Sequence, residues 1–262
     1  DVNGRFDWPR VLVTNGTVAG KEGGQIAVRG GWDIRAKELL ATRVAGDIRR
    51  STLARWLPAQ PEFETLAVEA EASGPIATLA HSGSTRAEKV SFRGIKPLAV
   101  AATWTGRGRA IEKLTLDTSA GATRLALTAS LDAESLRLAT LDLNQNDVVQ
   151  LRLTRPTVLR WRPALEIQQL HLAGPTAALD ANLTWGSVGR IEVAARNIAS
   201  SLLADLVSLP GPAWQVRSLA VNGSWDSGPM SFSAVFGGAV ALGQDRQAVV
   251  NLSARGDANG VR

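Results

Sequence analysis

The stretch FETLAVEAEASGP at residues 63–75 returns in similar form as VRSLAVNGSWDSGP at residues 216–229. Both contain Leu-Ala-Val, then small and polar residues, and both end in Ser-Gly-Pro. Two such similar stretches, far apart in one chain of 262 residues, indicate one structural unit that is used twice.

A looser pattern, apolar-x-x-apolar-x-apolar, extends this repeat through most of the chain. Successive occurrences are 21 to 29 residues apart, as their middle residues fall at 11, 39, 66, 90, 114, 141, 170, 191 and 219. A period of this length is typical of repeat proteins, in which each unit buries its apolar side against its neighbours. We therefore predict one repetitive module over residues 1–262, and we expect it to be an internal segment of a longer chain.

The residues around each repeat alternate between apolar and polar, which indicates β-strands with one apolar face. Leu114 and Leu116, for example, alternate with Thr115 and Asp117. The apolar-x-x-apolar step interrupts this alternation by one residue, and a β-bulge at that point would return the next side chain to the same face.

Two segments have helical spacing instead. DIRRSTLARWLP begins with a capping Asp47, and NIASSLLADLVSLP begins with Asn197; each ends at a proline. They predict short amphipathic helices near residues 48–57 and 198–209.

Two short helices cannot cover the apolar face of so many strands. The predicted fold is therefore mainly β: an elongated, curled, repetitive antiparallel sheet that forms a taco-like β-groove, with two short amphipathic helices. An apolar groove suits acyl chains, which need no polar partner. The residues predicted to line it are Leu66, Val68, Leu114, Leu116, Leu125, Leu127, Leu141, Leu143, Leu151, Leu153, Leu170, Leu172, Leu183, Trp185, Ile191, Val193, Leu219 and Val221.

Composition argues against several other classes of protein. The chain has no cysteine, and its 29 basic residues are scattered, whereas a nucleic-acid arm would concentrate them. His81 is predicted in a turn and His171 on a polar strand face; without a Gly-x-Ser-x-Gly elbow they indicate no catalytic site. We predict no enzyme, no metal, no cofactor and no nucleic-acid partner. The eight tryptophans are spread along the chain, as packing anchors would be.

The stretch RPTVLRWRP at residues 155–163 leaves two interpretations open. Arginine next to tryptophan can bind phosphate or nucleic acid. The favoured interpretation is an edge or loop in which Trp161 covers one end of the groove, with Arg160 and Arg162 placed to meet lipid headgroups.

The sequence motif of a predicted helix ending in Leu-Pro, a short loop, apolar-x-x-Leu-x-Val, polar residues and then Ser-Gly-Pro resembles the AsmA-like and TamB family. It stands at residues 196–236, and more loosely at residues 46–79. The resemblance implies a periplasmic protein that is held in the bacterial inner membrane by an N-terminal helix, missing from this sequence. It also implies phospholipid as the cargo and an outer-membrane β-barrel protein of the TamA type as a partner.

The expected function is a non-enzymatic groove that carries phospholipid acyl chains between the inner and outer membranes of a bacterial envelope. The alternative is a structural β-repeat scaffold that assists the assembly of outer-membrane β-barrel proteins.

Overall fold

The computed structural model describes residues 1–262 except 21–22, 54–60, 210, 227–229, 244–245, 258–259 and 262. Contacts between Cα atoms divide the chain into two units. The first is Asp1–Ala120 with Ser130–Ala133, and the second is Gly121–Ala129 with Glu134–Arg262. No helix in the described ranges is long and apolar enough to cross a membrane.

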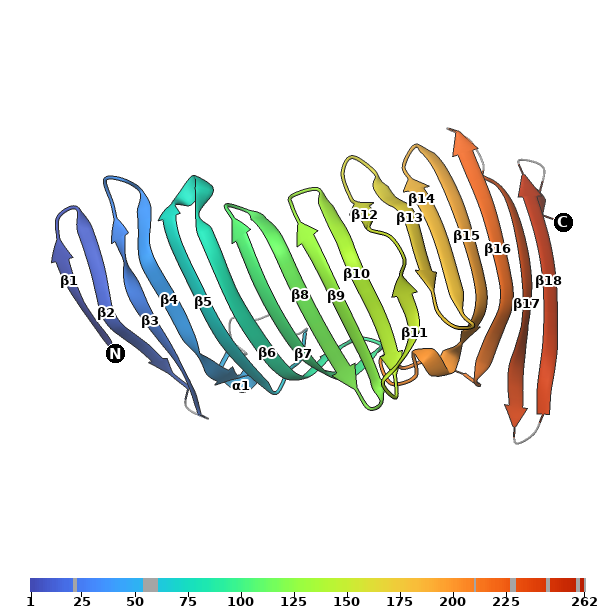
Figure 1. Ribbon diagram of the computed structural model, residues 1–262, viewed down its shortest axis with the longest axis horizontal. Helices are drawn as coiled ribbons and strands as arrows, with labels where there is room; N and C mark the ends of the chain where they lie inside the picture. Colours follow the sequence, from blue (N-terminus) through green and yellow to red (C-terminus); the bar gives the residue numbers. More distant parts are fainter. Residues whose placement is uncertain are drawn as a thin grey trace. The chain divides into compact units, whose positions relative to one another are not determined.

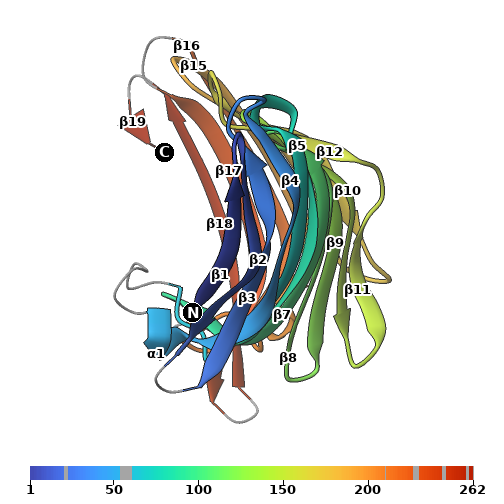
Figure 2. The same ribbon diagram turned by 90° about the vertical axis from the view of Figure 1, so that its left-hand side faces the viewer.

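The first unit is an antiparallel sheet in which each strand pairs with the next one along the chain (Figure 1). Its strands are β1 Val2–Asp7, β2 Arg10–Ala19, β3 Gly24–Asp33, β4 Glu38–Arg49, β5 Thr65–Pro75, β6 Ala80–Phe92, β7 Ile95–Arg107 and β8 Ala110–Ala120. The short helix α1, Arg50–Leu53, follows β4, and a 3-10 turn, η1 Ile76–Thr78, follows β5. These strands are bowed, and α1 lies on the concave side of their sheet (Figure 2).

The second unit is also an antiparallel sheet. Its strands are β9 Thr123–Leu131, β10 Ser135–Gln145, β11 Val148–Leu153, β12 Thr157–Arg160, β13 Leu165–Ala173, β14 Ala178–Trp185, β15 Val188–Ala199, β16 Trp214–Asp226, β17 Ser231–Gly243, β18 Arg246–Asp257 and β19 Gly260–Val261. The prediction of a mainly β, antiparallel protein is confirmed; the prediction of a single module stays a prediction.

In the second unit, two short strands, β11 and β12, follow each other between the same two neighbours, β10 and β13. Along β10, Leu143 pairs with Leu151 of β11, while Leu138 pairs with Thr157 of β12. On the other side, β13 pairs with the same two strands. The break falls at Pro156, which has no backbone N–H to donate to a neighbouring strand. Residues 155–163, predicted to be an edge or loop, thus contain β12, and β12 has a neighbouring strand on each side.

β-Bulges occur at some of the apolar-x-x-apolar steps, although the step from Val188 to Ile191 is paired regularly. The pairing shifts between Ala87 and Val90 of β6, and between Ile167 and Leu170 of β13. In each bulge one residue has a positive φ, 54° at Lys89 and 53° at Gln169. The bulge keeps the apolar side chains before and after it on the same face.

The second predicted helix, over residues 198–209, is wrong. Ile198 still belongs to β15, where it pairs with Val216. The chain then forms the 3-10 turn η2, Ser200–Leu202, and further turns up to Leu206. These turns suffice to bury Leu202 and Leu206, at 8% and 9% exposure, so no regular helix is needed to place them.

The first predicted helix, over residues 48–57, is not seen in the part of the chain that the structure describes. Ile48 and Arg49 end β4, where they pair with β5, and α1 has only four residues. Ile48 is 1% exposed, which is typical of a strand position with neighbours on both sides. Residues 54–57 lie outside the described residues.

Candidate functional site

Strand pairing in the first unit aligns apolar and small side chains in rows that run across the strands. Val68 of β5 lies opposite Thr85 of β6, and Ala102 of β7 lies opposite Leu116 of β8. Since alternate residues of a strand share a face, neighbouring rows lie on the same side of the sheet. Three of these rows are Leu66–Ala87–Val100, Val68–Thr85–Ala102–Leu116 and Ala70–Gly83–Trp104–Leu114.

The second unit has longer apolar rows. Leu172 of β13 pairs with Leu153 on one side and with Leu179 on the other. The rows are Leu153–Leu172–Leu179–Ala195–Leu219–Phe236, Leu170–Ala181–Val193–Val221–Ala234 and Leu159–Ile167–Leu183–Ile191–Gly223–Phe232. Together they give this sheet one continuous apolar face.

The residues predicted to line a groove fall into two sets. The first unit contains Leu66, Val68, Leu114 and Leu116, and the pairing places all four on its apolar face. In the second unit, β10, β11 and β13 to β16 place ten predicted residues on one face: Leu143, Leu151, Leu153, Leu170, Leu172, Leu183, Ile191, Val193, Leu219 and Val221. Trp185 pairs with Leu165 two residues after Leu183 and so lies on the same face. Of the others, Leu125 and Leu127 lie in β9, and Leu141 lies in β10.

Aromatic rings lie across glycines of the neighbouring strand. A Cβ added to Gly83 would come within 2.5 Å of the Trp104 ring, and one added to Gly189 would overlap the Trp225 ring. Such pairs let a large ring lie flat on a sheet. The indole nitrogen of Trp225 also donates to the carbonyl oxygen of Gly186 at 2.9 Å. Sequence reasoning left these rings out of the predicted site, although a glycine opposite each of them was a usable signal.

The two apolar faces differ in how far they are covered. Among the described residues of the first unit, Ile48 alone is a buried hydrophobic residue. The second unit contains several, among them Leu138, Leu143, Leu151 and Leu153 at 5–7% exposure. The apolar face of the first unit is thus the more accessible to a ligand.

A segment between β15 and β16 packs against the start of β9 in the second unit. The Asp205 carboxylate accepts hydrogen bonds from the Thr123 hydroxyl at 2.9 Å and from the Ala122 backbone N–H at 3.2 Å. Gln145 donates to the carbonyl oxygen of Ser201 at 3.1 Å. Thr123, only 1% exposed, is covered by this contact. We call residues 200–209 the covering segment.

The opposite face of each sheet is polar and carries ion pairs. Arg152 binds Asp142 through two hydrogen bonds of 2.7 and 3.0 Å, and this contact raises the pKa of Arg152. Outside the regular pairing, Lys89 of the β6 bulge lies 2.5 Å from Glu64, which precedes β5, and its hydrogen bond lowers the pKa of that carboxyl. Both pairs are exposed to solvent, so they contribute little to stability.

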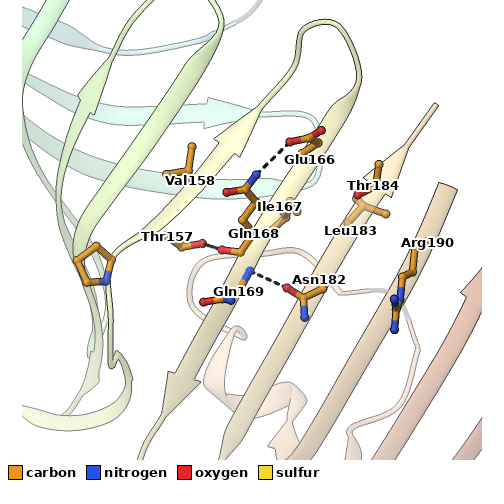
Figure 3. Close-up of a pocket in the computed structure, with 11 residues that line it drawn as sticks. Thr157, Val158, Glu166, Ile167, Gln168, Gln169, Asn182, Leu183, Thr184 and Arg190 are labelled. Carbon is orange, nitrogen blue, oxygen red and sulfur yellow. Dashed lines mark hydrogen bonds between the residues drawn. The ribbon is translucent and has the colours of Figure 1, made fainter. Parts of the chain in front are cut away.

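A hollow of about 480 Å³ lies beside the break between β11 and β12 (Figure 3). Its polar groups bind one another: the Gln168 amide donates to Glu166 at 3.2 Å, and the Gln169 backbone N–H donates to the Asn182 side chain at 2.7 Å. Arg160 lies 3.5 Å from Glu166, so this arginine, predicted to meet lipid headgroups, already has a carboxylate partner.

The two histidines occupy different faces. His171 contacts Asp180 on the polar face, as predicted. His81 lies within β6, so its prediction in a turn is wrong. It pairs with Ala72 and Gly106 on the apolar face, and its ring lies over Gly106. The described residues contain no group of three or more metal-binding side chains.

No protein-family model matches the chain, and no curated protein or solved structure matches it.

Proposed function

We propose that the chain is a non-enzymatic lipid-binding protein whose apolar faces line a curled groove for phospholipid acyl chains. The observation that carries the proposal is the alignment of apolar rows on one face of a sheet, with one buried hydrophobic residue among the described residues of the first unit. An apolar face in contact with water is unfavourable, and large faces of this kind mark binding surfaces. Each methylene of an acyl chain moved onto it from water contributes about 0.8 kcal/mol.

The bowing of the first-unit strands supports the groove (Figure 2). Small residues such as Gly83 and Ala87 stand in its apolar rows and leave space above the backbone for an acyl chain. Rows of similar side chains offer many weak, equivalent positions, which suits a chain that slides rather than docks in one pose. The resemblance to the AsmA-like and TamB family supports transport between the two membranes of a bacterial envelope, with the chain in the periplasm.

Photo-cross-linking at two adjacent residues of β7 tests this proposal. Ala102 lies in the row between Val68 and Leu116, whereas Ala101 pairs with Arg86 and Asp117 on the opposite face. A photoreactive side chain placed at Ala102, in protein incubated with phospholipid vesicles, is expected to capture lipid. The same group at Ala101 is the control and is expected to capture almost none. Equal capture at both positions would show that lipid does not select the apolar face.

Two acidic substitutions in the same row test the apolar contacts. Val68→Asp with Leu116→Asp is expected to lower lipid capture at Ala102 at least tenfold, because an ionised carboxylate in contact with hydrocarbon is strongly disfavoured. The matched control, Ala67→Asp with Thr115→Asp, changes neighbouring exposed residues on the other face of the same strands. Circular dichroism checks that both variants keep their strands. No lipid on the unaltered protein would favour the scaffold alternative instead.

A further inference from the structure

Four turns at one end of the first unit are joined into a single surface by backbone hydrogen bonds. The N–H of Ile34 donates to the carbonyl of Pro9 at 2.9 Å. The N–H of Ile76 donates to Lys37 at 3.3 Å, and the N–H of Gly108 donates to Leu79 at 2.8 Å. These bonds link the turns β1–β2, β3–β4, β5–β6 and β7–β8 (Figure 1). We call residues 6–10, 34–38, 76–79 and 107–109 the turn surface.

Large apolar side chains project into solvent from the turn surface. Trp8 is 68% exposed, Phe6 63%, Ile76 57% and Ile34 38%. The rings of Phe6 and Trp8 are 6.3 Å apart, so they form one aromatic pair. Turns at the surface of a protein are usually polar, and a group of exposed apolar residues at such turns indicates an interaction surface.

Exposed cations stand in or next to two of the same turns. Arg35, Lys37, Arg107 and Arg109 are exposed, and none of them forms an ion pair within the described ranges. Glu38 is an acidic residue of this surface that also forms no ion pair in the described part of the chain, so the cations without an ion pair are in excess there.

The other two carboxylates near this surface are already engaged. Asp33 accepts the Ala36 N–H at 2.8 Å and lies 3.2 Å from Arg10, and Asp7 lies 3.5 Å from Arg5. The backbone hydrogen bond from Ala36, followed by the contact with Arg10, keeps the pKa of Asp33 below its usual value. The cations that remain give the turn surface a positive charge.

We propose that the turn surface docks on a phospholipid bilayer that carries anionic headgroups. Tryptophan and other apolar side chains at turn tips insert between headgroups, while arginine and lysine attract the anionic surface. A nucleic acid would also attract the cations, but it offers no hydrocarbon for Ile34 and Ile76. The inference goes beyond the proposed function, because it assigns a membrane contact to the ends of the strands and not to their apolar face.

Co-sedimentation with vesicles tests the docking. The full chain is incubated with vesicles of phosphatidylcholine containing 30% phosphatidylglycerol, on the order of the anionic content that attracts basic segments, and with vesicles of phosphatidylcholine alone. Binding to the anionic vesicles is expected to be at least about 100-fold stronger, since four basic residues each contribute roughly a factor of five, and to fall with added salt. Equal binding to both kinds of vesicle would overturn the proposal.

Charge removal locates the contact. Arg35→Gln, Lys37→Gln, Arg107→Gln and Arg109→Gln together are expected to weaken binding by about two orders of magnitude or more, since each basic residue near an anionic surface contributes roughly a factor of five. The control, R29Q/R86Q/K96Q/K113Q, removes the same charge from exposed positions of the first unit elsewhere. Similar losses in both variants would show non-specific attraction and overturn the proposal.

The apolar contact has its own pair of variants. Trp8→Ala with Ile76→Ser is expected to weaken binding about tenfold, by losing the burial of two large side chains. Phe92→Ala with Ile95→Ser, at the β6–β7 turn, is the control and is expected to leave binding unchanged. Equal effects of the two pairs would contradict the docking.

A competition experiment separates a bilayer from other anions. Glycerol phosphate at millimolar concentration and a short DNA duplex are added to the vesicle assay. Neither is expected to displace the protein; displacement by the first would indicate a site for a single phosphate, and by the second a nucleic-acid surface. Lipid capture at Ala102 is measured with vesicles of phosphatidylcholine alone, to which the proposed docking does not apply. Failure of the docking is therefore distinguishable from failure of the proposed groove.

Discussion

Replacing Leu151 and Leu153 with Asp is expected to unfold the strands around β11. Both side chains are 7% exposed, and each pairs with another buried leucine, Leu143 or Leu172. Losing a buried leucine costs about 2–5 kcal/mol, and an unpaired carboxylate in its place adds a further penalty. The sum exceeds roughly 5 kcal/mol, which is comparable with the whole stability of a domain. Hydrogen exchange is expected to lose its protection in β10 to β13.

The matched control for this prediction is Thr154→Asp. Thr154 directly follows Leu153 and is exposed, so the added charge stays near water. We expect its effect on the free energy of unfolding to be within about 1 kcal/mol. If the doubly substituted protein kept native exchange protection, these leucines would not belong to a packed core. The comparison also shows why the open apolar face of the first unit, and not this region, suits the lipid-binding test.

Shortening the two buried leucines of the covering segment is expected to have the second largest effect. Leu202→Ala with Leu206→Ala should lower the free energy of unfolding of the second unit by about 4 kcal/mol or more, because each change leaves a cavity. Urea unfolding followed by tryptophan fluorescence measures this change. The control is Leu203→Ala, a half-buried residue of the same segment, which we expect to cost less than half as much.

Asp205 connects the covering segment to β9, and its replacement completes the test. Asp205→Ala leaves the Thr123 hydroxyl and the Ala122 N–H without this acceptor, at a cost of about 1–3 kcal/mol. Asp205→Asn keeps one acceptor oxygen and should recover part of that loss. If the leucine and aspartate variants all matched the unaltered protein, the covering segment would contribute nothing to the stability of this unit.

The strands and their facing were predictable because they depend on local patterns. Period-two alternation located the strands, and the apolar-x-x-apolar step located the bulges at Lys89 and Gln169. A bulge needs one additional residue and a tolerated positive φ, and both are properties of a few consecutive residues. The eighteen residues predicted to line a groove were chosen by the same alternation, and their role in a groove stays a prediction.

The covering segment could not be predicted, since its conformation depends on residues far away in the chain. Ile198, Leu202, Leu206 and Leu209 have helical spacing, and that spacing alone favours a helix. The structure instead keeps Ile198 in β15, while Asp205 binds Thr123, which lies 82 residues earlier. Tertiary contacts of this kind override local preference.

His81 shows a second limit of local reasoning. Its neighbours Ser82, Gly83 and Ser84 have the composition of a turn, which led to the wrong prediction. In β6, Gly83 is instead the residue over which the Trp104 ring lies. A glycine in a strand is disfavoured by its own propensity, and only the aromatic partner on the next strand makes the position understandable.

Pairing between consecutive strands has a consequence for how such a chain can change length during evolution. From β2 to β8, each strand of the first unit pairs only with its sequence neighbours, so duplicating or deleting a whole hairpin there would leave the remaining partners intact. The second unit has no such freedom between β9 and β15, because the bond from Thr123 to Asp205 spans that entire interval. Variation in hairpin number among descendants should therefore concentrate in the first unit.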